Sequence, residues 1–432
     1  MGIRAQSQRI GSQIAKYGPY GVFRRGSQRV AERASTVLDW DELDFPLRSV
    51  DVRTAETAGQ PAVELRGDDK LRIGWVCMPP ASGSGGHTTL FRMVEAMESR
   101  GHECTVLLYD RNSDDVTRHE DNIRRGWPEI RARISSATSD LGDLDAIVAS
   151  SWATAHVVAN RSSGDAKRFY FIQDYEPYFY PKGYLYALAE STYRFGFHNI
   201  ALGEMVAHEV RTRSGVEPSI VVPFGCDRDT YRVIARQAGD PPRSGIVYYA
   251  KQSVDRRGYT LARATLERFH ELCPGEPIHV VGDRVRGWNA PVVNHGSMRP
   301  ADLNILYNKT VAGLAMSFTN VSLVPGELLA AGNIPVLNDA VDARRDLTAK
   351  HAVWAEPTPD ALALALAGVV SASAAQIDER ATHASRSAPP GWERTKSAVV
   401  EFIEDHCPSE KARTAGALES VPSVQQRGES SD

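Results

Sequence analysis

The stretch that decides the fold spans residues 317–337 and reads SFTNVSLVPGELLAAGNIPVL. Its pattern predicts a strand end, a polar loop, a helix that stops at Gly332, and a further strand. The first turn of a helix has unpaired backbone N–H groups, so with the small polar residues before it this turn suits an anionic diphosphate. Glu327 falls within the predicted helix, and its carboxylate is better suited to accept hydrogen bonds from nucleoside hydroxyls. The alternative is an ordinary α/β helix with Glu327 in solvent.

Alternating strands and helices extend from this stretch in both directions. Apolar segments, typical of parallel strands covered on both faces, are predicted at 71–78, 104–109, 146–149, 168–172, 199–202 and 219–222, and again at 245–249, 278–282, 311–316, 334–337 and 352–354. Residues 224–244 are rich in glycine, proline and charge and indicate a connector. We therefore expect an α/β chain with an N-terminal arm and linker (1–69), two doubly wound domains (70–236 and 237–390), a last helix (391–407) and a disordered tail (408–432).

Composition excludes several function classes. The chain has 432 residues and a net charge of −4, which argues against a general nucleic-acid binder because such proteins cluster Lys and Arg. No apolar run approaches the roughly 18 residues that a spanning helix needs. The five cysteines are scattered and odd in number, without a Cys-x-x-Cys pair, so neither a disulfide framework nor a zinc site is indicated. A reducing cytoplasm fits this pattern.

The N-terminal arm is locally basic. Residues 1–34 hold seven Arg and Lys side chains and one acid, Glu32. Each basic residue near an anionic membrane contributes about 1 kcal/mol, so the arm could hold the protein at the inner face of the membrane. The alternative is an arm with no partner, since Gly18, Pro19 and Gly21 interrupt any long helix.

A glycine-rich loop follows the first predicted strand. Residues 81–89 read ASGSGGHTT and precede a helix predicted over 87–99. A dinucleotide fingerprint would need Gly or Ala where Thr88 stands, so a Rossmann NAD(P)-dependent oxidoreductase is an alternative with weak support. Gly85 and Gly86 allow a ligand to approach the backbone. His87 is a candidate acceptor contact, or else a structural residue.

Three cations follow the first strand of the second domain: Lys251, Arg256 and Arg257. Side chains at the carboxyl ends of parallel strands face the ligand crevice. Paired cationic donors stabilise the negative charge that develops on a departing nucleoside diphosphate, so no metal is required. The alternative is a solvated run of charge. Asp114, Asp115 and Asp283 lack further ligands at useful spacing, and we assign no metal.

Residues 173–181 read QDYEPYFYP and follow another predicted strand. Aromatic rings pack on sugar faces while carboxylates accept hydrogen bonds from sugar hydroxyls. We therefore assign Asp174, Tyr175 and Glu176 to an acceptor site, with Asp174 orienting or activating the acceptor hydroxyl. The alternative is a hydrophobic seam between the two domains.

With these motifs in place, residues 70–405 resemble family-4 glycosyltransferases of GT-B architecture, most closely bacterial rhamnosyltransferases that use dTDP-rhamnose. Glu327 matches the second glutamate of the family's Glu-x7-Glu region, whereas Thr319 stands in place of the first. Ala250 and Lys251 replace a Gly-Arg pair. The resemblance implies two Rossmann-like domains facing across a cleft and a C-terminal helix that crosses back onto the first domain.

The function implied by the resemblance is retaining transfer of a hexosyl group, with L-rhamnose from dTDP-rhamnose the leading candidate, to a hydroxyl of a polysaccharide or glycolipid. Asp174, Arg257 and Glu327 would be catalytic. The donor would contact Gly85, Gly86, Lys251, Arg256, Arg257, Ser317, Thr319, Asn320, Ser322, Leu323 and Glu327. A non-catalytic scaffold in a glycan-assembly complex is the further alternative, because the first glutamate is missing.

Overall fold

The computed structural model describes residues 45–53, 70–81, 83–137, 141, 143–162, 166–237, 239–321, 323–340, 342–347 and 350–407. The basic arm (1–34), the tail (408–432) and Ser322 lie outside these residues. The chain divides into two compact units, Met1–Val52 and Arg53–Asp432. Of the first unit, only residues 45–52 are described, and they contain one 3-10 turn, η1 (Ser49–Asp51).

The first sheet has seven parallel strands in the order β3-β2-β1-β4-β5-β6-β7. Their bounds are β1 (Arg72–Cys77), β2 (Glu103–Leu108), β3 (Arg133–Ser136), β4 (Ala146–Ala149), β5 (Lys167–Ile172), β6 (His198–Leu202) and β7 (Ile220–Val222). The six apolar strands agree with the sequence prediction. Strand β3 was missed because it lies at the sheet edge and only Ile134 among its four residues is buried.

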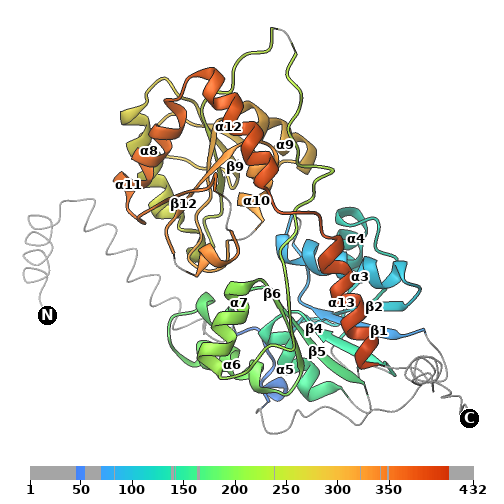
Figure 1. Cartoon of the computed structure of the whole chain (residues 1–432). Helices are drawn as coiled ribbons and strands as arrows, with labels where there is room; N and C mark the ends of the chain where they lie inside the picture. The colour runs from blue at the N-terminus through green and yellow to red at the C-terminus, as the bar shows by residue number, and fades with distance from the viewer. Residues whose placement is uncertain are drawn as a thin grey trace, which may run out of the picture. The chain divides into compact units, whose positions relative to one another are not determined.

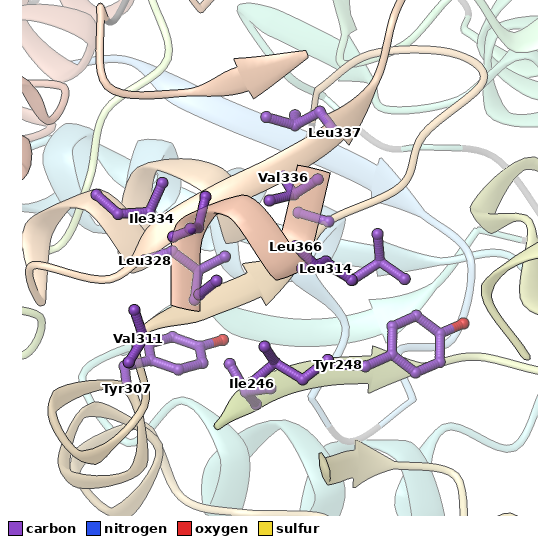
Figure 2. Packing of buried hydrophobic residues seen from close by; sticks show 14 of the residues in the cluster. Ile246, Tyr248, Tyr307, Val311, Leu314, Leu328, Ile334, Val336, Leu337 and Leu366 are labelled. Atoms are coloured by element: carbon purple, nitrogen blue, oxygen red, sulfur yellow. The ribbon is translucent and has the colours of Figure 1, made fainter. Parts of the chain in front are cut away.

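The second sheet has six parallel strands in the order β10-β9-β8-β11-β12-β13. Their bounds are β8 (Ile246–Ala250), β9 (Ile278–Gly282), β10 (Val293–Gly296), β11 (Ala312–Leu314), β12 (Ile334–Asn338) and β13 (Val353–Ala355). Edge strand β10 was missed because none of its residues is fully buried. Figure 2 shows the core of this sheet, where Leu314 and Val336 pack with Leu366 of a covering helix.

Helices connect the strands, and several begin at side-chain caps. Ser84, Thr358 and Ser373 each accept a hydrogen bond from a backbone N–H in the first turn, which pairs a group that would otherwise lack a partner. The helices are α3 (Gly85–Ser99), α4 (Thr117–Gly126), α5 (Trp152–Arg161), α6 (Tyr184–Ser191), α7 (Glu204–Glu209), α8 (Tyr259–Leu272), α9 (Pro300–Lys309), α10 (Val324–Ala330), α11 (Pro359–Val370), α12 (Ala374–Ser387) and α13 (Glu393–His406).

Short helical turns lie between these elements. They are the 3-10 turns η3 (Glu176–Phe179), η4 (Thr192–Arg194), η6 (Asp255–Arg257) and η7 (Ala343–Arg345), and a π turn, η5 (Val210–Ser214). Two of them, η3 and η6, carry residues of the candidate site.

The last helix, α13, packs on the first sheet, as the resemblance implied (Figure 1). Val399 and Ile403 are buried in the core of that sheet. The Thr395 hydroxyl donates a 2.6 Å hydrogen bond to the carbonyl of Pro223, and the Cys226 N–H donates one of 2.8 Å to the carbonyl of Pro390. The segment that leaves the first sheet and the one that returns to it therefore lie side by side.

Within the described residues, no single helix has both the length and the apolarity to cross a membrane. Helices α11 and α12 meet both criteria when they are taken together, but they are bent by 107° relative to each other. Leu362 and Leu366 of α11 lie in the core of the second sheet. All five cysteines are free thiols.

Candidate functional site

The site begins with three crowded cations on the second sheet. Lys251 follows β8, and Arg256 and Arg257 form the end of η6. Burial lowers the pKa of Arg257 to about 10, with Asp174 opposing this shift and Arg256 adding to it. Burial, followed by repulsion from Arg257 and Arg256, also lowers the pKa of Lys251, against the attraction of Asp283. Three cations thus share two carboxylates, and a bound anion would relieve their repulsion.

Arg257 binds the loop at the start of the stretch 317–337. Its Nη1 donates hydrogen bonds of 2.7 Å to Ser317 Oγ and 3.4 Å to the carbonyl of Asn320. Its Nη2 donates one of 3.4 Å to Asn320 Oδ1. The Ser317 hydroxyl closes the loop by donating to the same Asn320 carbonyl at 2.5 Å. The sequence prediction placed these residues together, and the structure places them around one guanidinium.

The same loop is joined to the first sheet through Asp174. The Thr319 hydroxyl donates a 2.8 Å hydrogen bond to Asp174 Oδ2, and the Asn320 side-chain amide donates one of 2.7 Å to the carbonyl of Gln173. Asp174 and Thr319 are 5% and 3% exposed. Burial raises the pKa of Asp174. Its carboxylate is therefore occupied in holding Thr319, and the predicted role of Asp174 in activating an acceptor hydroxyl is corrected to one of positioning.

Arg256 reaches across to the aromatic segment of the first sheet. Its guanidinium lies over the ring of Phe179 at 4.0 Å, and its Nε is 3.8 Å from Asp174 Oδ2. A guanidinium stacked on an aromatic face is stabilised by the ring quadrupole and keeps its outer N–H groups available. Phe179 of the aromatic run thus takes part in the contact between the two domains, whereas Tyr175 and Tyr178 bond within the first domain.

The helix after the loop follows the predicted order of polar loop and helix. Helix α10 begins at Val324, and its N-cap Leu323 makes no side-chain capping hydrogen bond. Thr319 and Asn320 therefore lie before the first turn, as predicted. The prediction that these residues and the helix end together form an anion site stays a prediction, as does the role of the three cations.

Gly85 and Gly86 form the first turn of α3 and lie against the other candidate residues. A Cβ at Gly85 would be 3.9 Å from Leu323 Cδ1, and one at Gly86 would be 3.7 Å from Gln173 Oε1. The structure thus brings the glycine loop, Leu323 and the 173–174 segment together. Sequence reasoning assigned the first two to one site but missed Gln173.

The remaining predicted acceptor residues are structural. Both ring nitrogens of His87 are bonded within the chain, one to Ser84 Oγ at 2.8 Å and the other to the carbonyl of Met78 at 2.9 Å. The Tyr175 ring is fully buried, and its hydroxyl donates to Glu190 at 2.9 Å. These contacts leave no polar atom of His87 or Tyr175 directed at a ligand.

Glu176 is also a core residue. It is 5% exposed and accepts hydrogen bonds from the Tyr170 hydroxyl at 3.0 Å and from the backbone N–H of Trp152, at the start of α5. Burial raises the pKa of Glu176 to about 8. A carboxylate buried among aromatic residues matched a sugar site in sequence, but its hydrogen bonds stabilise the first domain.

Glu327 is half-buried on α10. Among the described residues no hydrogen bond reaches its carboxylate. Burial raises its pKa to about 7, opposed by Arg92 of α3 and reinforced by Asp227. Arg92 Nη2 lies 3.7 Å from Asp227 Oδ2. Glu327 is therefore available to a ligand, and sequence reasoning missed both charged neighbours because helical position alone does not reveal what a side chain faces.

A cavity of about 710 Å³ lies at a place that the sequence did not indicate. Its lining includes Lys182, Tyr186, Glu190, His208, Arg213 and Asp342. Ligand atoms of His208, Glu209 and Asp342 lie within 4.8 Å of one another, the one such group of possible metal ligands among the described residues. None of the predicted donor residues lines this cavity.

Comparison with known proteins gives a family model over part of the chain and a similar curated protein. Residues 127–205 match the family model of the WsaF N-terminal domain. The chain is 27% identical over 407 residues to the O-antigen biosynthesis protein RfbC of Myxococcus xanthus. The match covers 88% of this chain but 30% of that relative's length.

Solved structures agree on the fold. A glycosyltransferase from Rickettsia africae superposes with a TM-score of 0.55 at 13% identity, over 78% of this chain and 99% of the other. Anabaena Alr3699/HepE, in complex with UDP and glucose, superposes with a TM-score of 0.55 at 14% identity, over 81% and 100%. Identity at this level establishes the fold and leaves the activity open. The chain therefore has the GT-B fold of these glycosyltransferases, with two parallel-sheet α/β domains.

Proposed function

We propose that the chain is a retaining glycosyltransferase that moves a hexosyl group from a nucleoside diphosphate sugar to a hydroxyl of a polysaccharide or glycolipid. The observation that carries the proposal is the cation cluster beside Asp174. Arg256 Nε lies 3.8 Å from Asp174 Oδ2, and Arg257 donates to Ser317 and Asn320 of the loop that Asp174 holds. The charges of Arg257 and Arg256 also add to the lowering of the Lys251 pKa by burial. An anion with several oxygens fits such a cluster, because each guanidinium can hold two oxygens at once. The similarity to an O-antigen biosynthesis protein supports a polysaccharide pathway.

In this proposal the cationic and the acidic residues have separate roles. Arg256, Arg257 and Lys251 stabilise the negative charge that grows on the departing diphosphate, with no metal required. Glu327, with a half-buried carboxylate that is free to accept, binds nucleoside hydroxyls. Asp174 holds Thr319 and so fixes the loop that surrounds Arg257. Residues 70–236 form the acceptor domain and residues 237–390 the donor domain.

Thr319 supports a 6-deoxy sugar as the donor. Its hydroxyl is bonded to Asp174 and its side chain is buried, so this position offers no free carboxylate to the sugar. L-Rhamnose carried by dTDP is the leading candidate because it lacks the 6-hydroxyl. We place the reaction in the cytoplasm at the inner face of the membrane, with residues 1–34 as the contact.

The test is a donor screen by saturation-transfer NMR with dTDP-, UDP- and GDP-sugars, followed by turnover with each binder. We expect dTDP-rhamnose to bind best and the product to keep the anomeric configuration of the donor. The absence of saturation by every nucleotide sugar would overturn the proposal. Binding of NAD(P) by calorimetry would instead favour the oxidoreductase. Turnover that persists in both Arg257→Ala and Glu327→Ala would exclude these residues from the reaction, and donor binding without turnover would favour the scaffold.

A further inference from the structure

The cavity of about 710 Å³ has walls from three parts of the chain. Tyr186 and Glu190 come from α6, and Arg213 comes from η5, which continues α7. Asp342, which precedes η7 of the second domain, completes the lining. Residues from both domains therefore face one space, as a site for the second substrate of a transferase requires.

Two tyrosines connect this cavity to the loop that carries Asp174. The Tyr175 hydroxyl donates a 2.9 Å hydrogen bond to Glu190, and the Tyr178 hydroxyl donates one of 2.6 Å to Glu209. Both glutamates line the cavity. The segment with these two tyrosines begins directly after Asp174, so hydrogen bonds link the cavity wall to the segment that binds Thr319.

The cavity lacks the surplus of positive charge that the cation cluster has. Its lining holds three carboxylates, Glu190, Glu209 and Asp342, against two full cations, Lys182 and Arg213. Glu209 is paired with Arg213 at 2.9 Å. Arg345 pairs with Asp342 at 3.3 Å and brings the local charge to balance. A ligand with several phosphates would thus meet no surplus of positive charge here, whereas it meets one at Lys251, Arg256 and Arg257.

The hydrogen-bonding groups of the lining fit a ligand that both donates and accepts. Carboxylate oxygens accept, Lys182 and Arg213 donate, and the phenol of Tyr186 does both. Sugar hydroxyls have this dual character, and an aromatic ring can cover the apolar face of a pyranose. We propose that this cavity binds a neutral, non-phosphorylated carbohydrate, the acceptor glycan. The identification as acceptor rests on the proposed function; the carbohydrate site itself rests on the lining.

A metal ion is disfavoured at this place although three possible ligands converge. Arg345 Nη2 lies 3.4 Å from His208 Nε2, and Arg345 Nε lies 3.3 Å from Asp342 Oδ1. Glu209 already accepts hydrogen bonds from Tyr178 and Arg213. A divalent cation would have to displace two guanidinium groups that now neutralise its ligands.

The experiment uses the full chain and three neutral probes, the p-nitrophenyl glycosides of α-L-rhamnose, α-D-mannose and β-D-glucose, with UDP and dTDP as anionic probes. Saturation-transfer NMR would measure each affinity. We expect at least one glycoside to bind the wild type and to lose at least tenfold in affinity in Tyr186→Ala, in Glu190→Gln and in the surface variant Lys182→Ala. Tyr184→Ala is the matched control, because Tyr184 lies on the same helix, is 58% exposed and is not part of the lining.

The outcomes separate this inference from the proposed function. Failure of every glycoside to bind, equal affinity in the three cavity variants and the wild type, or loss of glycoside binding after EDTA treatment would each overturn the carbohydrate site. Loss of nucleotide rather than glycoside binding in the cavity variants would overturn it as well. Glycoside binding that depends on the cavity, in a chain that binds no nucleotide sugar, would leave the carbohydrate site standing and overturn the transferase.

Discussion

The hydroxyl of Thr319 donates a 2.8 Å hydrogen bond to Oδ2 of Asp174, although 145 residues separate the two in the chain. Asp174 follows a strand of the first sheet, and Thr319 follows a strand of the second. Both residues are buried. One polar pair thus connects the loops that carry the candidate site, and its removal should affect both stability and activity.

Replacement of Thr319 by valine tests this pair. Thr319→Val keeps the side-chain shape but leaves a buried carboxyl oxygen without its donor, which should lower the free energy of unfolding by about 1–3 kcal/mol. Urea denaturation would measure the loss. Thr319→Ser keeps the hydroxyl and is the control, expected to lie nearer to the wild type. Equal stability of the valine variant and the wild type would show that the hydrogen bond contributes nothing net.

Arg257 should be essential for donor affinity. Arg257→Ala removes a charge and its hydrogen bonds, and loss of one charge-assisted bond costs about 1.5–3 kcal/mol, which is about 10- to 150-fold in affinity. Arg257→Lys keeps the charge without the planar fork and should recover only part of the loss. Calorimetry with the nucleotide identified in the donor screen would measure both variants.

Arg268→Ala provides the matched control for Arg257. Arg268 also carries a guanidinium on the second domain, but it pairs with Glu271 and Asp360 at the surface. We expect unchanged nucleotide affinity in this variant. A similar loss in both arginine variants would indicate a general effect of charge and would contradict a specific role for Arg257.

The raised pKa of Glu327, about 7, predicts a pH dependence of donor binding. A carboxylate accepts nucleoside hydroxyls better than its protonated form does, so donor affinity should fall as the pH drops below 7, by up to about tenfold per pH unit. Glu327→Gln cannot ionise and should remove that dependence. Affinity measured from pH 5.5 to 8.5 in both proteins would test this, and parallel profiles would count against Glu327 as the nucleoside contact.

The same raised pKa of Glu327 should make the stability of the fold change with pH in the direction opposite to donor affinity. The folded-state pKa lies above the ordinary value of 4.5, so the neutral form stabilises the fold at low pH, and this contribution is lost as the pH rises through about 7. The difference in unfolding free energy between the wild type and Glu327→Gln should therefore shift against the wild type between pH 4.5 and pH 7.5. Chemical denaturation across that range would measure the shift.

Gly258 is required at the start of α8. Its φ is +61°, and a Cβ would lie 2.9 Å from both Met316 Cε and Phe318 Cε2. Gly258→Ala should destabilise the chain by about 1–3 kcal/mol, because the left-handed conformation is strained for alanine and the two side chains must move. Thermal unfolding would measure this. Gly275→Ala is the control, since nothing lies within 4 Å of its Cβ position.

The sequence alone was enough to predict the strands that are apolar along their whole length. Such runs, as in β4 and β11, indicate burial on both sheet faces, and the structure confirms them. Edge strands β3 and β10 carry polar residues and resemble loops in sequence.

The residue types of the candidate site could be predicted from the sequence, but the hydrogen-bond partners of those residues could not. Lys251, Arg256 and Arg257 follow a strand end, and that position alone brings them together. Glu176 and His87 have the same chemical character as ligand-binding residues, but their hydrogen bonds are satisfied inside the chain. Which polar groups remain unpaired depends on tertiary packing, and a single sequence does not show it.

The side-by-side exit and return segments at Cys226 and Pro390 make the second domain an insertion in the first. Deletion of the chain from residue 391 onward would remove Val399 and Ile403 from the core of the first sheet. The strands of the second sheet would stay intact. Excision of the whole insertion, with a short linker between its neighbouring ends, should instead yield an autonomously folding first domain. The two ends of the inserted domain also lie next to each other. They could be joined in a circular permutant whose new termini lie elsewhere in the second domain, and the parts on either side of the opening could then be labelled separately.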